Sequence, residues 1–323
     1  MSTLALIGCM ASVPLADPMA FPSVYWTDGD TGADLECFYS TIGTTYTEIT
    51  PSLPAMGIGD NAYNGSGTWV ACPPSSATAN EIYVSSNPLV GWATYSLSFQ
   101  PSGVCWDGTR FLIAGSGGNV AYAVNPAGSW TSWTSGVSTA LNCIEFGNGK
   151  YAIGGTTNVL RVATSLGGSF TSRLAAGTGT SVNCIKYNSA SSGRWLACGT
   201  AGQVMYTTDA NMAGTNWTRY AVNSVQWNYI ACDDTNWCII GNSRAGYSSN
   251  PTVAGNWTNN GPWATANGWC VKYSAALGLW IALGVNFIRT TTGVPSTSST
   301  WTNRMPGGTS GAQNARKGLI VTS

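Results

Sequence analysis

Few side chains in this sequence could carry out acid–base chemistry. Its 323 residues include no histidine, and charged residues make up only 8% of the chain. Asp233 and Asp234 are the only carboxylates adjacent in the sequence, and glycoside hydrolysis requires a pair of carboxyl groups roughly 5–10 Å apart. The stretch Asp-Asp-Thr-Asn is typical of a hairpin turn, and a nucleophilic triad of the usual kind needs histidine. We therefore expect no enzyme and no catalytic residue.

Three charged residues recur at one position of a repeated segment. Glu145, Lys186 and Lys272 each follow an apolar β-branched residue in a short alternating stretch. If neighbouring repeats are arranged around a centre, equivalent positions would ring a central channel. We interpret the three side chains as candidates for a solvated channel lining.

Cysteines also recur at equivalent positions. Cys143, Cys184 and Cys270 share one position, and Cys72 and Cys198 share another. Equivalent positions of successive repeats point the same way, which favours small buried core residues over disulfide pairs. Without histidine or a CxxC pair, a zinc site has little support. We expect neither a metal nor a cofactor.

Tryptophan offers the better ligand chemistry, because an exposed indole face can stack on a sugar ring. Of the 15 tryptophans, most belong to repeating series. The candidates for ligand binding are Trp26, Trp133 and Trp263. Trp263 lies in Asn-Asn-Gly-Pro-Trp-Ala, a loop between repeats, and is the best exposed candidate. Burial is the competing expectation, since tryptophan is highly buried on average.

Aromatic residues recur at intervals of about forty, which indicates a repeat architecture. One series is Tyr46, Trp92, Trp130, Phe170, Trp217, Trp257 and Trp301. A second series, out of phase with the first, is Trp69, Phe111, Tyr151, Trp195, Trp237 and Trp280. Each repeat should therefore be one supersecondary unit.

One repeat can be followed through residues 182–220. Alternating segments at 182–187, 194–199, 203–208 and 216–220 are separated by turns rich in Gly, Ser and Asn, which predicts four short strands. Four strands in about forty residues form the blade of a β-propeller. We expect the first strand of each blade to line the channel and the aromatic series to fill the space between blades.

Counting the repeats predicts an all-β chain, with residues 1–323 forming a single seven-bladed β-propeller of four-stranded blades. Six blades would begin near residues 56, 100, 140, 181, 225 and 268. The seventh would be built from residues 1–50 and 312–323, so that both termini close the ring and protect the strand edges. Residues 318–321 would be its inner strand, and either residues 3–7 or residues 22–28 its second. Residues 1–34 would partly form an irregular extension.

The turn before each strand-four aromatic resembles an Asp-box, the Ser-x-Asp-x-Gly-x-x-Trp motif of sialidase-like propellers. The copies are Tyr206-Thr-Thr-Asp209…Gly214-Thr-Asn-Trp217, Tyr247-Ser-Ser-Asn250…Gly255-Asn-Trp257, Tyr122-Ala-Val-Asn125…Gly128-Ser-Trp130 and Phe38-Tyr-Ser-Thr-Ile-Gly43…Tyr46. Asp-boxes are turn-forming elements on the propeller rim, so the resemblance implies architecture rather than activity. The low charge and the abundance of Gly, Ser, Thr, Asn and Trp are similar to propeller domains of bacteriophage tail and virion proteins.

A sialidase would also need arginines that converge on the substrate carboxylate. The candidates are Arg161, Arg173, Arg219, Arg289 and Arg304. They fall on predicted third strands or beside fourth strands, toward the outside of the blades. We therefore expect them not to converge.

The net charge is zero, but the charges are unevenly distributed. Residues 1–109 contain nine acids and no base, whereas residues 110–323 contain thirteen bases and four acids. Acidic and basic sectors of this kind suit docking by complementary fields, with chance in a charge-poor chain as the alternative. The bases are spaced apart, which argues against binding of nucleic acid.

The start of the chain gives little sign of secretion. Leu6-Ile7-Gly8-Cys9 is similar to a lipoprotein cleavage box, but no Lys or Arg precedes it and the apolar run is too short for a signal peptide. No stretch is long enough to span a membrane. We expect no cleaved signal peptide, no membrane insertion, and location in a virion assembled in the host cytoplasm.

These features favour a non-catalytic structural or interaction protein of a phage particle, in the tail or on the capsid, with host attachment as a further role. Its partners would be other virion proteins, and a homo-oligomer or a host-surface glycan is compatible with this reading. The alternative is a Trp-rich, glycan-binding propeller lectin, which predicts exposed aromatic residues in equivalent loops. A sialidase-like glycosidase predicts carboxylates that converge at the channel mouth, and a cellular assembly factor of propeller type also fits the fold.

Overall fold

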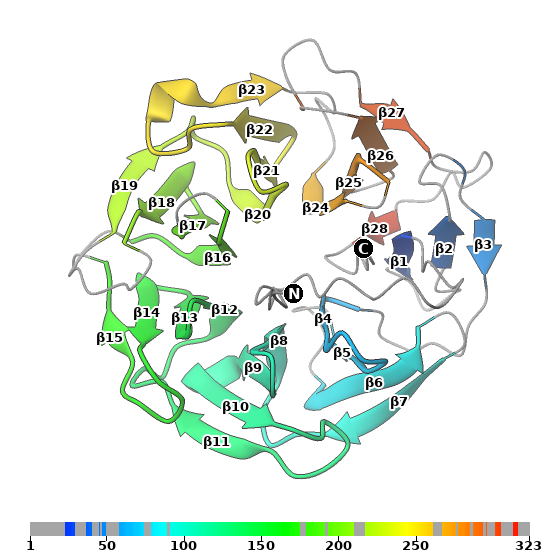
Figure 1. The fold of residues 1–323 in the computed structure, drawn as a ribbon, viewed down its shortest axis with the longest axis vertical. Coiled ribbons are helices and arrows are strands. Elements are labelled where there is room, and N and C mark those ends of the chain that lie inside the picture. Colours follow the sequence, from blue (N-terminus) through cyan, green and yellow to red (C-terminus); the bar gives the residue numbers. More distant parts are fainter. Residues whose placement is uncertain are drawn as a thin grey trace, which may run out of the picture.

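Six four-stranded antiparallel sheets stand around a common centre as the blades of a β-propeller (Figure 1). The computed structural model describes residues 23–29, 37–40, 45, 47–49, 58–304 and 313–315, with gaps at 74–78, 89–90, 175–178, 191–192, 210–216, 261–266, 276, 285–286, 293–294 and 296–300. We number the blades I to VI in chain order. In each of them the first strand is innermost and the fourth is outermost.

The strands of the first three blades are short. Blade I contains β4 (Asp60–Tyr63), β5 (Trp69–Cys72), β6 (Glu81–Asn87) and β7 (Gly91–Ser96). Blade II contains β8 (Pro101–Trp106), β9 (Phe111–Gly115), the 3-10 turn η1 (Ser116–Gly118), β10 (Asn119–Ala123) and β11 (Thr131–Thr134). Blade III contains β12 (Leu141–Gly147), β13 (Lys150–Gly155), β14 (Val159–Ala163) and β15 (Thr171–Ser172).

The next three blades repeat the plan. Blade IV contains β16 (Val182–Asn188), β17 (Arg194–Gly199), β18 (Gln203–Thr207) and β19 (Thr218–Ala221). Blade V contains β20 (Trp227–Cys232), β21 (Trp237–Gly241), β22 (Arg244–Ser248), the 3-10 turn η2 (Ala254–Asn256) and β23 (Thr258–Asn260). Blade VI contains β24 (Gly268–Ser274), β25 (Leu279–Gly284), β26 (Phe287–Thr292) and β27 (Thr302–Asn303). The six predicted blades are confirmed, each within four residues of the predicted start.

A further sheet, which we call the closing sheet, lies between blades VI and I (Figure 1). It joins β28 (Gln313–Ala315) to β1 (Ser23–Gly29), β2 (Cys37–Ser40) and β3 (Thr47–Ile49), in that order. β28 runs antiparallel to β1, with Thr27 opposite Ala315. β1 overlaps residues 22–28, one of the two stretches considered for a second strand. Residues 3–7 and 318–321 lie outside the described part.

An aromatic pair across strands one and two recurs through the ring. Tyr187 and Trp195 are paired between β16 and β17, with ring centroids 4.7 Å apart. Tyr273 and Trp280 repeat the contact in blade VI at 5.2 Å. Cross-strand pairs of this kind stabilise a sheet and fix its register. They account for the second aromatic series in the sequence.

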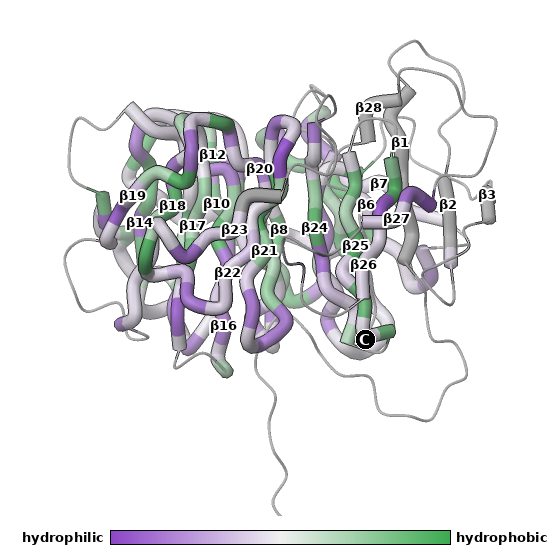
Figure 2. The backbone as a smooth tube through the Cα atoms, turned by 90° about the horizontal axis from the view of Figure 1, so that it is seen from above, coloured by the Kyte–Doolittle hydropathy of each residue, from purple (hydrophilic) through white to green (hydrophobic). Residues whose placement is uncertain are grey.

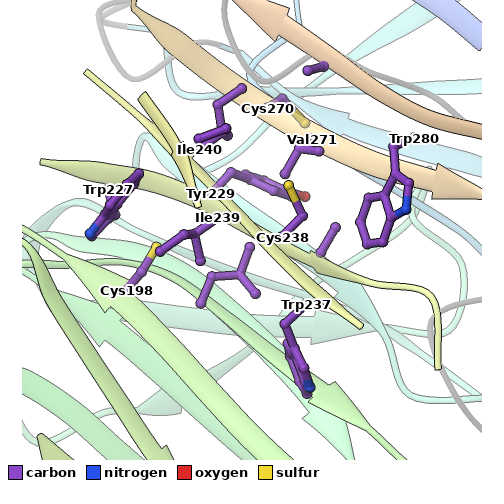
Figure 3. Close-up of a cluster of buried hydrophobic side chains, with 14 of the residues drawn as sticks. Cys198, Trp227, Tyr229, Trp237, Cys238, Ile239, Ile240, Cys270, Val271 and Trp280 are labelled. Atoms are coloured by element: carbon purple, nitrogen blue, oxygen red, sulfur yellow. The ribbon is translucent and has the colours of Figure 1, made fainter. Parts of the chain in front are cut away.

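Neighbouring blades cover the faces of the sheets, so the first three strands of each blade are largely buried, while the fourth, outermost strands are largely exposed. Figure 3 shows side chains of β17, β20, β21, β24 and β25 converging between blades IV, V and VI. Trp227, Trp237 and Trp280 are fully buried in this cluster. The eight cysteines whose side chains are described are free thiols, and seven of them are buried, as the repeat positions predicted.

Antiparallel strands give each blade two different ends, and the ring therefore has two faces. The hairpin face, as we call it, holds two turns of each blade: the turn between strands one and two and the turn between strands three and four. The other holds the turns between strands two and three and the links to the next blade, and we call it the connector face. Figure 2 shows the ring edge-on, with the strands running between these two faces.

Candidate functional site

A β-bulge marks the inner strands of blades II to VI. In each of these strands the pairing register shifts after the first residue, so the second residue has no partner on the neighbouring strand. The bulged residues are Ser102, Asn142, Asn183, Asn228 and Trp269. Bulges re-aim side chains, and here they turn polar groups toward the next blade.

Four bulged residues form hydrogen bonds that link successive blades. Asn183 Nδ2 donates to the carbonyl of Trp227 at 2.8 Å, and Asn228 Nδ2 donates to the carbonyl of Gly268 at 2.7 Å. Ser102 and Asn142 make the equivalent bonds to Leu141 and Val182. In blade VI the residue is Trp269, whose indole N–H is buried and makes no hydrogen bond within the described part. This series was not predicted from the sequence, although Asn recurs at that position in three inner strands.

Glu145 and Lys186, predicted to line the channel, form a salt bridge between blades III and IV. Lys186 Nζ lies 2.8 Å from Glu145 Oε2, and the Glu145 side chain is only 3% exposed. Burial raises the pKa of Glu145 above its ordinary value, and the Lys186 ammonium partly offsets this rise. Lys186 also lies 5.9 Å from the ring centroid of Tyr229 in blade V. The carboxylate therefore faces a neighbouring blade rather than open solvent.

Lys272 also faces another blade. Its ammonium donates to Asn61 Oδ1 of β4 at 3.2 Å, which connects blade VI to blade I. Beside Asn61, Asp60 Oδ2 accepts the backbone N–H of Val104 in blade II. The charged groups of the inner strands thus serve as links between blades.

Two aspartates hold turns on the hairpin face. Asp233 Oδ1 accepts the backbone N–H groups of Thr235 and Asn236, so the predicted hairpin turn at Asp233-Asp234 is confirmed. Asp107 does the same for Thr109 and Arg110 in blade II. A carboxylate that accepts hydrogen bonds from the backbone amides of a turn stabilises that turn.

The loops after strand three carry a second recurring turn. The backbone N–H of Asp209 donates to Thr207 Oγ1, and that of Asn250 donates to Ser248 Oγ. Asn87 and Ser85 form the same bond in blade I, a copy that the sequence analysis did not identify. Its signal is Ser-Ser-Asn-Pro, which precedes Trp92 as the same four residues precede Trp257.

Trp133, a ligand candidate from the sequence, lies in the core. It is 5% exposed, and its ring centroid lies 4.5 Å from that of Phe170 and 5.1 Å from that of Tyr151. Its Nε1–H donates to the carbonyl of Gly168 in the next blade. An indole packed in this way offers no face to a sugar. Trp130 of the structural series is the more exposed of the two.

Trp133 is more buried than Trp130 because the blades have a further aromatic position, three residues after the strand-four aromatic. Trp133 and Tyr220 occupy it in blades II and IV. The Tyr220 hydroxyl donates to the carbonyl of Pro251 in the next blade and accepts the indole N–H of Trp257. Trp26 lies in β1, opposite Cys37. The side chain of Trp26 and all of Trp263 lie outside the described part.

One groove of about 420 Å³ opens on the hairpin face between blades I and II. It is bordered by Thr68, Val84, Ser86, Val124 and Pro126. No ionisable residue lines it. Val124 is 66% exposed, but single exposed apolar residues are normal on protein surfaces. The groove is therefore a surface depression that lacks the convergent polar groups of a catalytic pocket.

The described ranges show neither a metal cluster nor a membrane-spanning helix. They contain no group of three or more His, Cys, Asp or Glu side chains that could hold a metal ion. Among these residues, no helix has the length and apolar character needed to cross a membrane.

The circular arrangement of four-stranded blades defines the class of protein: an all-β propeller. No protein-family model matches the chain, and no curated protein matches its sequence. Among solved structures it resembles "YCF48 bound to D1 peptide", with a TM-score of 0.61, 12% identity and coverage of 97% of this chain and 98% of that one. It also resembles the "WD40 beta propeller domain of Doa1", with a TM-score of 0.61, 12% identity and coverage of 91% and 88%. At this identity the likeness concerns the fold alone, and one fold serves many functions.

Proposed function

We propose that this protein is a non-catalytic interaction module, built as a seven-bladed β-propeller with the closing sheet as its seventh blade. The pairing of β28 with β1 supports this closure, because it joins strands from the two ends of the chain in the order of a blade. Joining N-terminal and C-terminal strands in one blade removes open strand edges. Such a ring would be a rigid body that presents its turns to partners.

The observation that carries the non-catalytic role is the use of carboxylates inside the fold. Seven acidic residues have described side chains, and five of them accept hydrogen bonds from backbone amides, tyrosine hydroxyls or lysine. The five are Asp60, Glu81, Asp107, Glu145 and Asp233. A general acid or base must be able to exchange a proton with its substrate. Oxygens engaged in turns and between blades are poorly placed to do so.

The proposed setting is a phage particle, as a tail or capsid-associated structural protein, with a role in host attachment. The low charge and the Gly-, Ser-, Thr- and Asn-rich composition support this setting. The Ser/Thr–Asn/Asp turns support a relationship to Asp-box propellers. A propeller of similar shape has been solved with a bound peptide, which supports a protein segment as the kind of partner.

Mass spectrometry of density-gradient-purified particles tests the proposal. We expect peptides of this chain to band with virions at a fixed ratio to known structural proteins. Recovery of the chain only in the soluble fraction would overturn the particle role. A glycan-binding screen comparing the wild type with Trp263→Ala would then test the lectin alternative.

A further inference from the structure

The charges of blades III to VI are divided between the two faces of the ring. Residues 110–323 contain only four acids: Glu145, Asp209, Asp233 and Asp234. Asp209, Asp233 and Asp234 follow β18 or β20 and lie on the hairpin face, and Glu145 is buried in β12. None of these four carboxylates lies on the connector face.

Six arginines of the same blades, in contrast, lie on the connector side, whereas Arg194, at the start of β17, lies on the hairpin side. Arg244 begins β22 directly after a two–three turn, and Arg173 and Arg304 directly follow β15 and β27. Arg173 is only 9% exposed, so the arginine rim, as we call the other members of this group, consists of Arg161, Arg219, Arg244, Arg289 and Arg304.

The other members of the arginine rim are directed to the same side by their contacts. Arg161 Nη1 donates to the carbonyl of Ser135 at 3.2 Å, in the link between blades II and III. Arg219 Nη1 lies 3.5 Å from Thr180 Oγ1, in the link between blades III and IV. The Arg289 guanidinium lies 5.0 Å from the ring centroid of Phe287, at the connector end of β26.

Several contacts of the arginine rim involve neutral oxygens. Arg161 donates to the carbonyls of Ser135 and Phe170, and Arg304 Nε donates to Thr290 Oγ1. Such partners orient a guanidinium but do not cancel its charge, and arginine stays protonated in proteins. Arg219 and Arg244 are exposed. Blades III to VI therefore present a positive field on one face.

The same chain carries the complementary charge. Residues 1–109 contain nine acids and no base, and they supply blade I and three strands of the closing sheet. Blades III and IV lie across the ring from the closing sheet (Figure 1). Two copies placed head to tail could therefore bring opposite charges together.

We propose that the arginine rim is a docking surface for the acidic N-terminal third, residues 1–109, of a second copy of this chain. The contact is heterologous, so repetition generates a ring or a filament. This inference rests on the proposed role as an assembling module and names one of its partners. Because the attraction is electrostatic, salt should weaken it.

Sedimentation velocity of the purified full-length protein tests the proposal. We expect oligomers at about 0.1 M salt and monomers at about 1 M salt, where the screening length falls from about 10 Å to about 3 Å. Arg219→Gln with Arg244→Gln should weaken association at least about tenfold. Lys150→Gln with Arg194→Gln removes the same charge from the hairpin face of blades III and IV and should leave association unchanged.

Three results would overturn the docking proposal. A monomer at both salt concentrations would mean that the arginine rim serves another anionic partner or the same chain. Oligomers that persist in the Arg219/Arg244 variant would place the contact elsewhere. An equal loss in both double variants would mean that only net charge matters. A monomer that still bands with particles would leave the proposed function intact, so the two failures can be told apart.

Discussion

The hairpin face and the connector face use their polar residues differently. On the hairpin face, Asp107 and Asp233 hold turns through backbone amides. On the connector face, Asn and Ser hold neighbouring blades together, while arginines contact neutral oxygens. In blades III to VI, the carboxylates of Glu145 and Asp233 are thus bound within the fold, whereas Arg219 and Arg244 are exposed. Substitutions on each face should therefore affect different properties.

The largest expected effect comes from Trp133→Ala, which empties a core site between blades II and III. Removing a buried Trp typically lowers the free energy of unfolding by about 3–5 kcal/mol. The loss of the hydrogen bond to Gly168 contributes to this change. Denaturant unfolding measures it, with Trp130→Ala at a half-buried position as control. Equal and small losses in both variants would contradict the assignment of Trp133 to the core.

Asp233→Ala should have the next largest effect and sharpens the account of the hairpin face. It leaves the amides of Thr235 and Asn236 without their acceptor, at a cost of about 1–3 kcal/mol. Asp233→Asn keeps an oxygen at the same place and should recover part of the loss. If Thr235→Ala, at an exposed neighbour, costs as much as Asp233→Ala, the carboxylate is not what holds the turn.

Asn183→Ala tests the blade-to-blade bonds near the connector face. Loss of the bond to the Trp227 carbonyl should lower the free energy of unfolding by about 1 kcal/mol. Ser224→Ala, at an exposed site nearby, provides the control and should change it by less than about 0.5 kcal/mol. An unchanged unfolding midpoint in Asn183→Ala would show that the bulge series does not contribute to stability.

The buried pair Glu145–Lys186 should make stability depend on pH. The pKa of Glu145 is raised in the folded protein, so in the range above its ordinary value of about 4.3 the folded state binds more protons than the unfolded state. The free energy of unfolding should therefore fall as pH rises through this range. Glu145→Gln should remove this component. Parallel pH profiles of the wild type and the variant would contradict the account.

The sequence predicted the repeat well because each blade repeats the same aromatic and apolar positions. Trp195 and Trp280 pack against the inner strand in the way their spacing implied. It did not separate Trp130 from Trp133, because both lie near the start of strand four and only packing against the next blade decides which one is buried.

The bulges and the two faces were not apparent from residue types alone. A bulge changes the direction of one side chain, so Asn183 has a role that strand alternation does not reveal. The arginines were expected not to converge on one site, but their place relative to the turns had to come from the strand bounds. Arg244 and Lys150 are both basic residues at the start of a strand, yet they lie on opposite faces of the ring.

The division between the faces is tested most directly by measuring stability and association together in two variants. The first carries Arg219→Gln, Arg244→Gln and Arg304→Gln, and the second carries Asp233→Ala. Sedimentation velocity and denaturant unfolding would be run on both under the same conditions. We predict that the arginine variant loses association while its unfolding free energy stays within about 1 kcal/mol of the wild type, and that the aspartate variant loses stability while association persists. Loss of both properties in each variant would contradict the separation of roles.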